Sequence, residues 1–359
     1  MEMDANEYLV LLLKYSHDRE ATDVHVCAGS CPLIRVNGLL CEISEMGVVS
    51  PTLIMKIIEC LLEPKKRQRL EEKRVLDFSF SKSGLGRFRT NIYSQRGTYA
   101  IAIRMLPFEI PEFSSLGLPD IVESFIHKTK GLFLATGATG SGKSTTLASL
   151  LDLINTNYNY HVITIEDPIE YLHKHKKSLM TQREIGDDAD TFANALRSAL
   201  REDPDVILVG EMRDYETISI ALTAAETGHL VFSTLHTVGA AKSIDRIIDA
   251  FPSSQQNQVR SQLATVLEGV VSQQLVPRAD KSGLVVASEV MIVNPAIRNL
   301  VREGRHYQIN SIMQTGQTKG MQLLDADLAD LCNRGVIDID SAMLFAQDQQ
   351  LLSRFLTRR

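Results

Sequence analysis

The sequence has little of three features that would narrow its class at once: cysteine, basic surplus and long apolar runs. Its five cysteines are an odd set, and the Cys27-x3-Cys31 pair has no second Cys or His pair at a metal-like spacing. We therefore expect reduced thiols rather than disulfides or a zinc site. Acidic residues outnumber basic ones by 44 to 38, a net charge of −6, which disfavours a dedicated nucleic-acid binder.

Apolar stretches are too short to cross a bilayer, which takes roughly 18 to 20 residues. The run at residues 9–13 is much shorter and has no cleavage-site pattern, so we expect neither a secretory signal nor a membrane anchor. A cytosolic protein is the expectation that remains. At 359 residues the chain exceeds the size at which single cores usually stop growing, and two domains are expected.

What the sequence does contain is a complete phosphate-binding loop. Residues 137–144 read Gly-Ala-Thr-Gly-Ser-Gly-Lys-Ser, which fits GxxxxGK[ST], after an apolar run at 132–135 and before a helical apolar pattern at about 142–155. Backbone N–H groups of such a loop wrap phosphates, the lysine reaches the β and γ oxygens, and the hydroxyl binds Mg²⁺. We predict a nucleoside triphosphate site made by Gly137, Thr139, Gly140, Ser141, Gly142, Lys143, Ser144 and Thr145.

Proline, serine and glycine divide the chain near residues 107 to 119, which predicts a first domain at 1–107, a linker at 108–118 and a second domain at 119–359. The first domain reads as small α+β. Its predicted helices lie at about 5–15, 51–62 and 64–73, and its strands at 23–27, 33–36, 76–81, 87–93 and 99–105. In the second domain, strands at 132–136, 162–166, 206–209 and 230–235 alternate with helices, the pattern of a mostly parallel sheet covered by helices.

Two strands of the second domain end in acids. The apolar run before Glu166 and Asp167, and the run before Glu211, place carboxylates at the carboxyl edge of the sheet, where doubly wound sheets bind ligands. Either acid alone could be a helix cap or a solvated turn. Beside a phosphate loop, both are candidates for holding Mg²⁺ and orienting water. His229 and His236 flank the strand at 230–235; taken alone, such histidines are usually packing residues.

Four segments together resemble the signature boxes of the secretion ATPases, the hexameric motors of type II secretion and type IV pili: the phosphate loop and residues 163–170, 209–214 and 227–236. The resemblance covers essentially the whole chain and is closest to retraction motors. Residues 296–300 read Ala-Ile-Arg-Asn-Leu, like the motif of that branch, and the sequence lacks the extra N-terminal region and tetracysteine zinc site of assembly motors. The implied fold is α/β: a RecA-like P-loop NTPase domain with a C-terminal helical region, preceded by a small α+β, PAS-like domain.

The resemblance also implies roles for the candidate side chains, with ATP as the nucleotide. Glu211, in a modified Walker B box with Gly210 where other NTPases carry Asp, would join Ser144 on Mg²⁺, and Glu166 would polarise the attacking water. His229 would sense the γ-phosphate, while His236 helps hold its box together.

Four arginines match the family's pairs around the nucleotide. Arg89 and Arg104 are expected to face the triphosphate across a domain or subunit boundary, and Arg197 and Arg213 to act from the large domain. Read without the resemblance, Arg89 and Arg104 fit solvated strand positions. An arginine supplied in trans can raise the rate by roughly 10³ to 10⁵.

The implied function is a Mg²⁺-dependent ATPase, a homohexameric motor that retracts type IV pili and drives twitching motility. It would act at the cytoplasmic face of the cell membrane on an inner-membrane platform protein, and through it on pilin, without nucleic acid. A pilus or type II secretion assembly ATPase is the main alternative; a nucleic-acid translocase and a non-hydrolysing accessory paralogue are others. In the segment that starts at Asn294, Arg298 and Asn299 are expected on an exposed polar helix face.

Overall fold

The computed structural model describes residues 4–107 and 109–356, which form two compact units. Unit 1 comprises Met1–Glu109 and Pro168–Leu172, and unit 2 comprises Ile110–Asp167 and His173–Arg359. The chain passes from unit 1 to unit 2 within the stretch predicted as the linker. Residue 108, at the start of that linker, and residues 1–3 and 357–359, at the ends of the predicted domains, lie outside the described residues.

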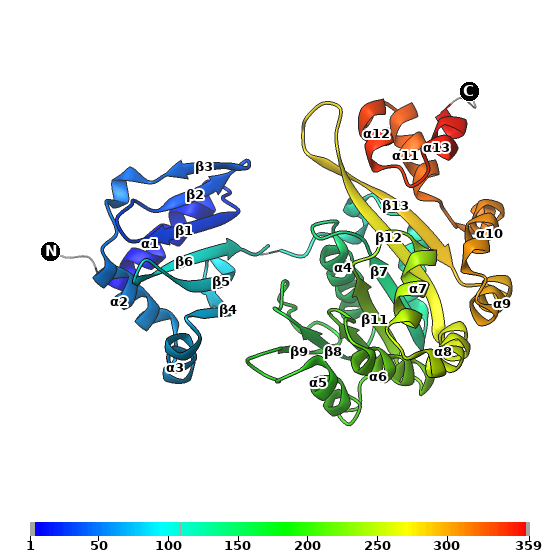
Figure 1. The fold of residues 1–359 in the computed structure, drawn as a ribbon, viewed down its shortest axis with the longest axis horizontal. Coiled ribbons are helices and arrows are strands. Elements are labelled where there is room, and N and C mark those ends of the chain that lie inside the picture. The colour runs from blue at the N-terminus through cyan, green and yellow to red at the C-terminus, as the bar shows by residue number, and fades with distance from the viewer. Residues whose placement is uncertain (1–3, 108, 357–359) are drawn as a thin grey trace. The chain divides into compact units, whose positions relative to one another are not determined.

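Unit 1 is built on a six-stranded antiparallel sheet in the order β3-β2-β1-β6-β5-β4, with three helices (Figure 1). Its core forms because the strands alternate: Val24 and Val26 of β1 are buried and pack with Leu12 and Leu13 of the first helix. The elements are α1 (Ala5–Asp18), β1 (Asp23–Cys27), β2 (Leu33–Val36), β3 (Leu39–Glu42), α2 (Pro51–Leu61), α3 (Pro64–Lys73), β4 (Val75–Lys82), β5 (Gly86–Gln95) and β6 (Thr98–Met105).

One strand of unit 1, β3, is absent from the sequence-based prediction. It pairs with β2 across a two-residue turn in which Asn37 and Gly38 have φ of 50° and 82°. Positive φ at both positions suits an Asn-Gly hairpin, whose signal was present in the sequence. The strand was missed because all four of its residues are exposed and it shows no alternation.

Unit 2 is built on a seven-stranded sheet in the order β13-β12-β7-β11-β10-β8-β9, in which only the β12–β13 pair is antiparallel. This confirms the predicted α/β class. The strands are β7 (Gly131–Thr136), β8 (His161–Glu166), β9 (Leu179–Glu184), β10 (Val206–Val209), β11 (Leu230–Leu235), β12 (Leu267–Pro277) and β13 (Leu284–Ile292). The prediction lacked β9, β12 and β13.

Helices cover both faces of this sheet, because the central strands bury side chains on each. On β7, Leu132 and Leu134 pack with one group of helices, and Phe133 and Ala135 pack with α4 and two 3₁₀ turns between 113 and 127 (Figure 1). The helices are α4 (Lys143–Asn157), α5 (Phe192–Ala199), α6 (Tyr215–Glu226), α7 (Ala240–Asp249), α8 (Ser253–Val266), α9 (Pro295–Glu303), α10 (Ile309–Thr315), α11 (Leu324–Asn333), α12 (Ile339–Phe345) and α13 (Gln349–Leu356).

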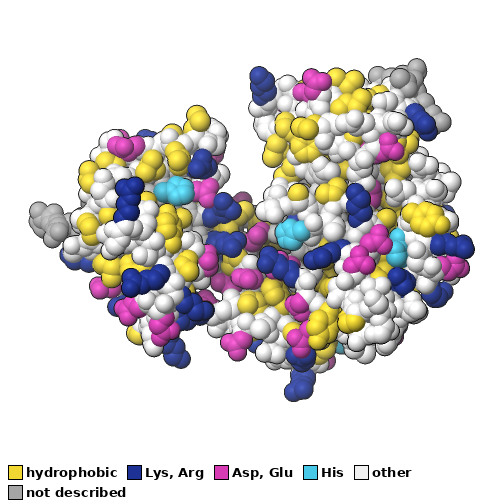
Figure 2. Space-filling view, viewed as in Figure 1, with side chains coloured by type: hydrophobic (Ala, Val, Ile, Leu, Met, Phe, Trp, Pro, Cys, Tyr) yellow, Lys and Arg dark blue, Asp and Glu magenta, His cyan; other side chains and the backbone are white. Residues whose placement is uncertain are grey.

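The last three helices, α11 to α13, form a small cluster against the β12–β13 hairpin, with Val276 and Ala287 in its core (Figure 1). Over the described residues, no helix has the length and apolar character that crossing a membrane requires. On the face drawn in Figure 2, Lys and Arg side chains are interspersed with Asp and Glu.

Candidate nucleotide-binding site

The phosphate loop joins β7 to α4 and is shaped by glycine. Gly137 has a φ of 143°, and a Cβ there would lie 2.3 Å from the carbonyl oxygen of Gln273, so only glycine fits. The buried side chain of Lys143 donates from Nζ to the carbonyl oxygens of Gly137 at 2.9 Å and Ala138 at 2.8 Å. The loop therefore curls around the lysine ammonium.

The loop fits a polyphosphate with Mg²⁺. Helix α4 begins at Lys143 and runs for 15 residues, so its N-terminal N–H groups and dipole favour an anion at the loop. The loop's tip is open, since a Cβ at Gly140 would meet nothing within 4 Å. Ser144, in the first turn of α4, is partly exposed and carries the hydroxyl that such loops place on the metal. Bound Mg²⁺ would supply positive charge that offsets the negative charge of the phosphates.

Three further candidate side chains lie at the same edge of the sheet as the loop. Strands β7, β11, β10 and β8 are neighbours in that order and run parallel, so their carboxyl ends share an edge. His236 follows β11, Glu211 follows β10 after one glycine, and Glu166 is the last residue of β8. The structure thus places all three at the edge of the sheet that carries the phosphate loop.

Glu166 is held by its own strand and the next one. Thr164 Oγ1 donates to Glu166 Oε1 at 2.7 Å, and Gln182 Nε2 on β9 lies 3.4 Å from the same oxygen. The geometry also explains Gly210: a Cβ there would lie 3.1 Å from the carbonyl oxygen of Ile165 and 3.3 Å from Glu166 Cα. An Asp at position 210 would crowd the backbone that carries Glu166.

Glu211 lies between a cationic arginine and a histidine. Arg213 Nε is 2.7 Å from Glu211 Oε1, and His236 Nε2 is 3.7 Å from Oε2. Burial, and then the positive charge of Lys143, lower the pKa of His236 below its ordinary value. His236 is therefore mainly neutral at pH 7, and its interaction with Lys143 places it near the phosphate loop.

The structure does not bring His229 to this edge, so the position of its side chain gives no support to the predicted role of sensing the γ-phosphate. His229 precedes β11, whose first residue Leu230 pairs with Gly131 at the start of β7, the end of the strand away from the phosphate loop. Its Nδ1 lies 3.0 Å from the carbonyl oxygen of Ala224 on α6, so the ring caps that helix. The rule that placed the acids after their strands also places His236, rather than His229, at the site.

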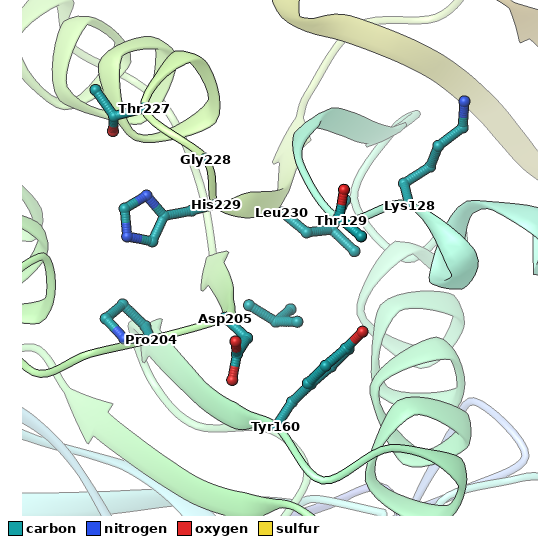
Figure 3. A pocket seen from close by; sticks show the side chains of 10 residues that line it. Lys128, Thr129, Tyr160, Pro204, Asp205, Thr227, Gly228, His229 and Leu230 are labelled. Atoms are coloured by element: carbon teal, nitrogen blue, oxygen red, sulfur yellow. The ribbon is translucent and has the colours of Figure 1, made fainter.

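His229 instead borders a cavity of about 300 Å³ at the amino ends of the strands (Figure 3). Its other walls include Tyr160, Asp205 and Lys128. The two charged groups have structural partners: Asp205 Oδ2 accepts from the His161 N–H at 2.8 Å, and Lys128 Nζ lies 2.9 Å from Glu268 Oε2. These charges therefore stabilise the fold on this side of the sheet.

The arginines of unit 2 differ in their surroundings. Arg213 is largely exposed, with its guanidinium on Glu211, and so lies at the site. Arg197, on α5, is paired with Glu216 on α6, an ion pair between two helices. The structure thus brings Arg213 and not Arg197 into contact with the strand-end acids.

The two arginines of unit 1 form a pair on its sheet. Arg89 of β5 lies directly opposite Arg104 of β6, and both are exposed. Arg104 Nε donates to Asp23 Oδ1 at 3.0 Å, which offsets part of the repulsion between neighbouring guanidinium groups. Two adjacent exposed cations make this part of unit 1 suited to an anion.

Helix α9 corrects the expectation for Arg298. Asn294 caps the helix as predicted, accepting from the Ile297 N–H at 2.9 Å. Arg298, however, is pinned: it donates to the carbonyl oxygens of Ala264 at 2.8 Å and Thr265 at 2.6 Å at the end of α8, and to Glu268 Oε1. Its guanidinium caps a neighbouring helix instead of facing solvent. Asn299 is exposed as expected.

Gln273 on β12 was missed by sequence reasoning. It is 2% exposed, and its Nε2 donates to Thr146 Oγ1 on α4 at 2.9 Å while its backbone carbonyl packs on Gly137. A signal existed, since Gln273 and Gln274 lie between the apolar pairs at 270–271 and 275–276. Within the described ranges, no group of three or more His, Cys, Asp or Glu side chains could hold a metal by itself, and the five cysteines are free.

Comparison with known proteins identifies similar chains. The family described as "Type II/IV secretion system protein" matches residues 42–335. The chain is 44% identical to a twitching motility protein of Neisseria gonorrhoeae (96% of this chain, 92% of the relative) and 46% identical to the type IV pilus retraction ATPase PilT of Pseudomonas aeruginosa (92% and 96%). A crystal structure of the pilus retraction motor PilT with bound ADP superposes with a TM-score of 0.91, at 49% identity over 97% of this chain and 98% of that one. These matches confirm the predicted resemblance.

Proposed function

The chain belongs to the family of type II/IV secretion system proteins, and from that premise we propose that it is an ATP-hydrolysing motor that retracts type IV pili. One observation supports this most strongly: an intact phosphate loop and the side chains of Glu166, Glu211 and His236 share one edge of a parallel sheet. Its relatives are named a twitching motility protein and a pilus retraction ATPase, and these names favour retraction of the pilus over its assembly.

In the proposed reaction, each residue at that edge has one task. Lys143 binds the β and γ phosphate oxygens, and Ser144 and Glu211 hold Mg²⁺, directly or through water. Glu166, oriented by Thr164, accepts the hydrogen bond of the attacking water. His236 takes the place first assigned to His229 and contacts the γ-phosphate, because it lies beside the loop.

The remaining parts of the proposal concern assembly. Arg89 and Arg104 face the triphosphate from unit 1 of the same or an adjoining copy in a homohexamer, while Arg213 acts from the large unit. Binding and release of nucleotide then change the relation between the units, and the motor acts on an inner-membrane platform protein at the cytoplasmic base of the pilus. Pilin subunits leave the fibre through that platform.

A phosphate-release assay on the purified chain tests the enzymatic half of this proposal. We expect Mg·ATP turnover that stops when EDTA removes the metal. Absence of turnover, also after addition of membranes containing the platform protein, would favour a nucleotide-binding accessory subunit. Salt-sensitive stimulation by DNA or RNA would favour a translocase.

Deletion of the gene in its host tests the direction of the motor. Cells without the chain should carry abundant static pili and lose twitching motility, because fibres are built but not withdrawn. Bald cells would instead identify an assembly motor. Re-expression of the wild-type chain should restore motility, and re-expression of the Lys143→Ala variant should not.

A further inference from the structure

Glu289 is a buried carboxylate that the proposed chemistry does not use. It lies on β13 and is 2% exposed. Its Oε1 accepts from the backbone N–H of Ala240, the first residue of α7, at 2.7 Å. It also accepts from Gln347 Nε2 at 3.3 Å, and the backbone of Leu324, the first residue of α11, is a further nearby donor that lowers the pKa of this carboxyl. One carboxylate therefore joins the N-termini of two helices.

Both helices need this external group, because neither carries its own cap. The N-cap positions are Gly239 for α7 and Leu323 for α11, and neither makes a side-chain capping bond. Helix N-termini leave N–H groups without partners and carry partial positive charge, and an anion satisfies both. Burial raises the pKa of Glu289, and the neighbouring charge of Asp325 adds to that, while the backbone donors oppose it.

Only three residues separate His236 from the start of helix α7. The intervening loop ends at Gly239, whose N–H donates to Ser272 Oγ at 2.8 Å, and Ser272 lies directly opposite Glu289 in the β12–β13 pair. Gly239 has a φ of 102°, and a Cβ there would lie 3.3 Å from the Gln347 side chain. The end of the loop that carries His236 is thus fixed by β12, β13 and the segment between α12 and α13.

We infer that Glu289 is a positioning residue for hydrolysis: it fixes the start of α7 and so the placement of His236 beside the phosphate loop. Through Leu324 and Gln347 the same carboxylate connects this placement to the C-terminal helices α11 to α13. The inference rests on the proposed function, in which His236 contacts the γ-phosphate. Among the described residues, the hydrogen-bonding partners of Glu289 are Ala240, Leu324 and Gln347, none of which is a candidate catalytic residue.

The test compares Glu289→Gln with Asp327→Asn. Asp327, on α11, accepts from the Ser288 N–H on β13 at 2.7 Å, so it joins the same strand to the same helix without contacting α7. We expect Glu289→Gln to lower kcat about tenfold with little change in KM, as misplacement of a catalytic group does. Asp327→Asn should lower the melting temperature similarly and leave kcat within about twofold of wild type.

Hydrogen exchange measured by mass spectrometry supplies a readout independent of turnover. In Glu289→Gln, amides at 236–242 should exchange faster than in wild type, and in Asp327→Asn they should not. If Glu289→Gln folds too poorly to assay, Gln347→Ala is the milder variant, with an expected kcat loss of about twofold to threefold. In a His236→Ala background, Glu289→Gln should cost no further activity.

Two results would overturn the inference. One is an unchanged exchange rate at 236–242 in Glu289→Gln. The other is a loss of kcat in both variants that is proportional to the loss of melting temperature in each. The exchange measurement also separates this inference from the proposed function. If the wild-type chain hydrolyses no ATP, the function fails, while faster exchange at 236–242 in Glu289→Gln still supports control of the loop by Glu289.

Discussion

The two ends of strand β11 carry the same residue type in different settings. His236, at the carboxyl end, lies 3.7 Å from Glu211 and interacts with Lys143. His229, at the amino end, bonds to a carbonyl oxygen at the end of α6. At about 3.3 Å per residue, the two lie roughly 20 Å apart. Whether a histidine lies at the carboxyl or the amino end of the strand therefore decides whether it belongs to the candidate site or only supports the fold.

The acids repeat the same contrast. Glu166 and Glu211 lie at the carboxyl edge with the phosphate loop, whereas at the amino edge Asp205 accepts a hydrogen bond from the backbone of His161. Each amino-edge charge satisfies a neighbouring group of the fold. Matched substitutions at the two edges should therefore separate activity from stability.

The largest difference is expected for the acids. Glu166→Gln should lower kcat by about 10²- to 10⁴-fold while ATP still binds, because the amide cannot accept a proton from water. Asp205→Asn should keep kcat near wild type and lower the melting temperature. Steady-state turnover and equilibrium ATP binding measure both. Rapid turnover by Glu166→Gln would transfer the role of orienting water to Glu211.

The next largest difference is expected for the lysines. Lys143→Ala should weaken ATP binding by about a hundredfold, since bonds from a cation to phosphate are lost. Lys128→Ala, which removes one of the two cationic partners of Glu268, should leave ATP affinity within about twofold. Fluorescent-nucleotide titration provides the dissociation constants. Equal losses at both positions would contradict the difference between the edges.

The histidines test the corrected assignment. His236→Ala should lower kcat about tenfold, the value of one hydrogen bond to a charged group. His229→Ala should mainly lower the melting temperature, because a helix cap is lost. Turnover and thermal unfolding of both variants decide the matter, and the reverse pattern would restore His229 as the γ-phosphate contact.

The smallest expected effects are at two glycines. Gly210→Ala should lower kcat about threefold to tenfold with little change in stability, because its Cβ pushes against the backbone of Glu166. Gly228 has open space around it but a φ of 115°, so Gly228→Ala should cost about 1–2 kcal/mol of unfolding free energy and little activity. Unfolding in urea and steady-state kinetics measure the two effects.

The sequence predicted most of this fold because its central strands are short apolar runs bounded by turn residues. It did not mark β12, since helix α8 ends at Val266 and the strand begins at Leu267 with no turn between them. Strand β9, at the outer edge of the sheet, has polar side chains at its last four positions and shows no extended apolar run. Local patterns fail where an element lacks boundaries or a buried face.

For the site, the loop and both acids were predictable because each belongs to a motif formed by consecutive residues. The roles of the histidines were also within reach, since strand direction places His236 after β11. The capping role of Arg298 was not, because its partners at Ala264 and Thr265 are brought near only by the fold. The same holds for Gln273, whose partner Thr146 is 127 positions away.

The most direct test of the central claim is hydrogen exchange of the whole chain with and without Mg²⁺ and a non-hydrolysable ATP analogue. Nucleotide should slow exchange at the carboxyl edge, in residues 137–145, 210–212 and 236–239, and leave the amino-edge residues 128–130, 204–206 and 227–230 unchanged. Protection around His229 and Asp205, with none at the phosphate loop, would contradict the account.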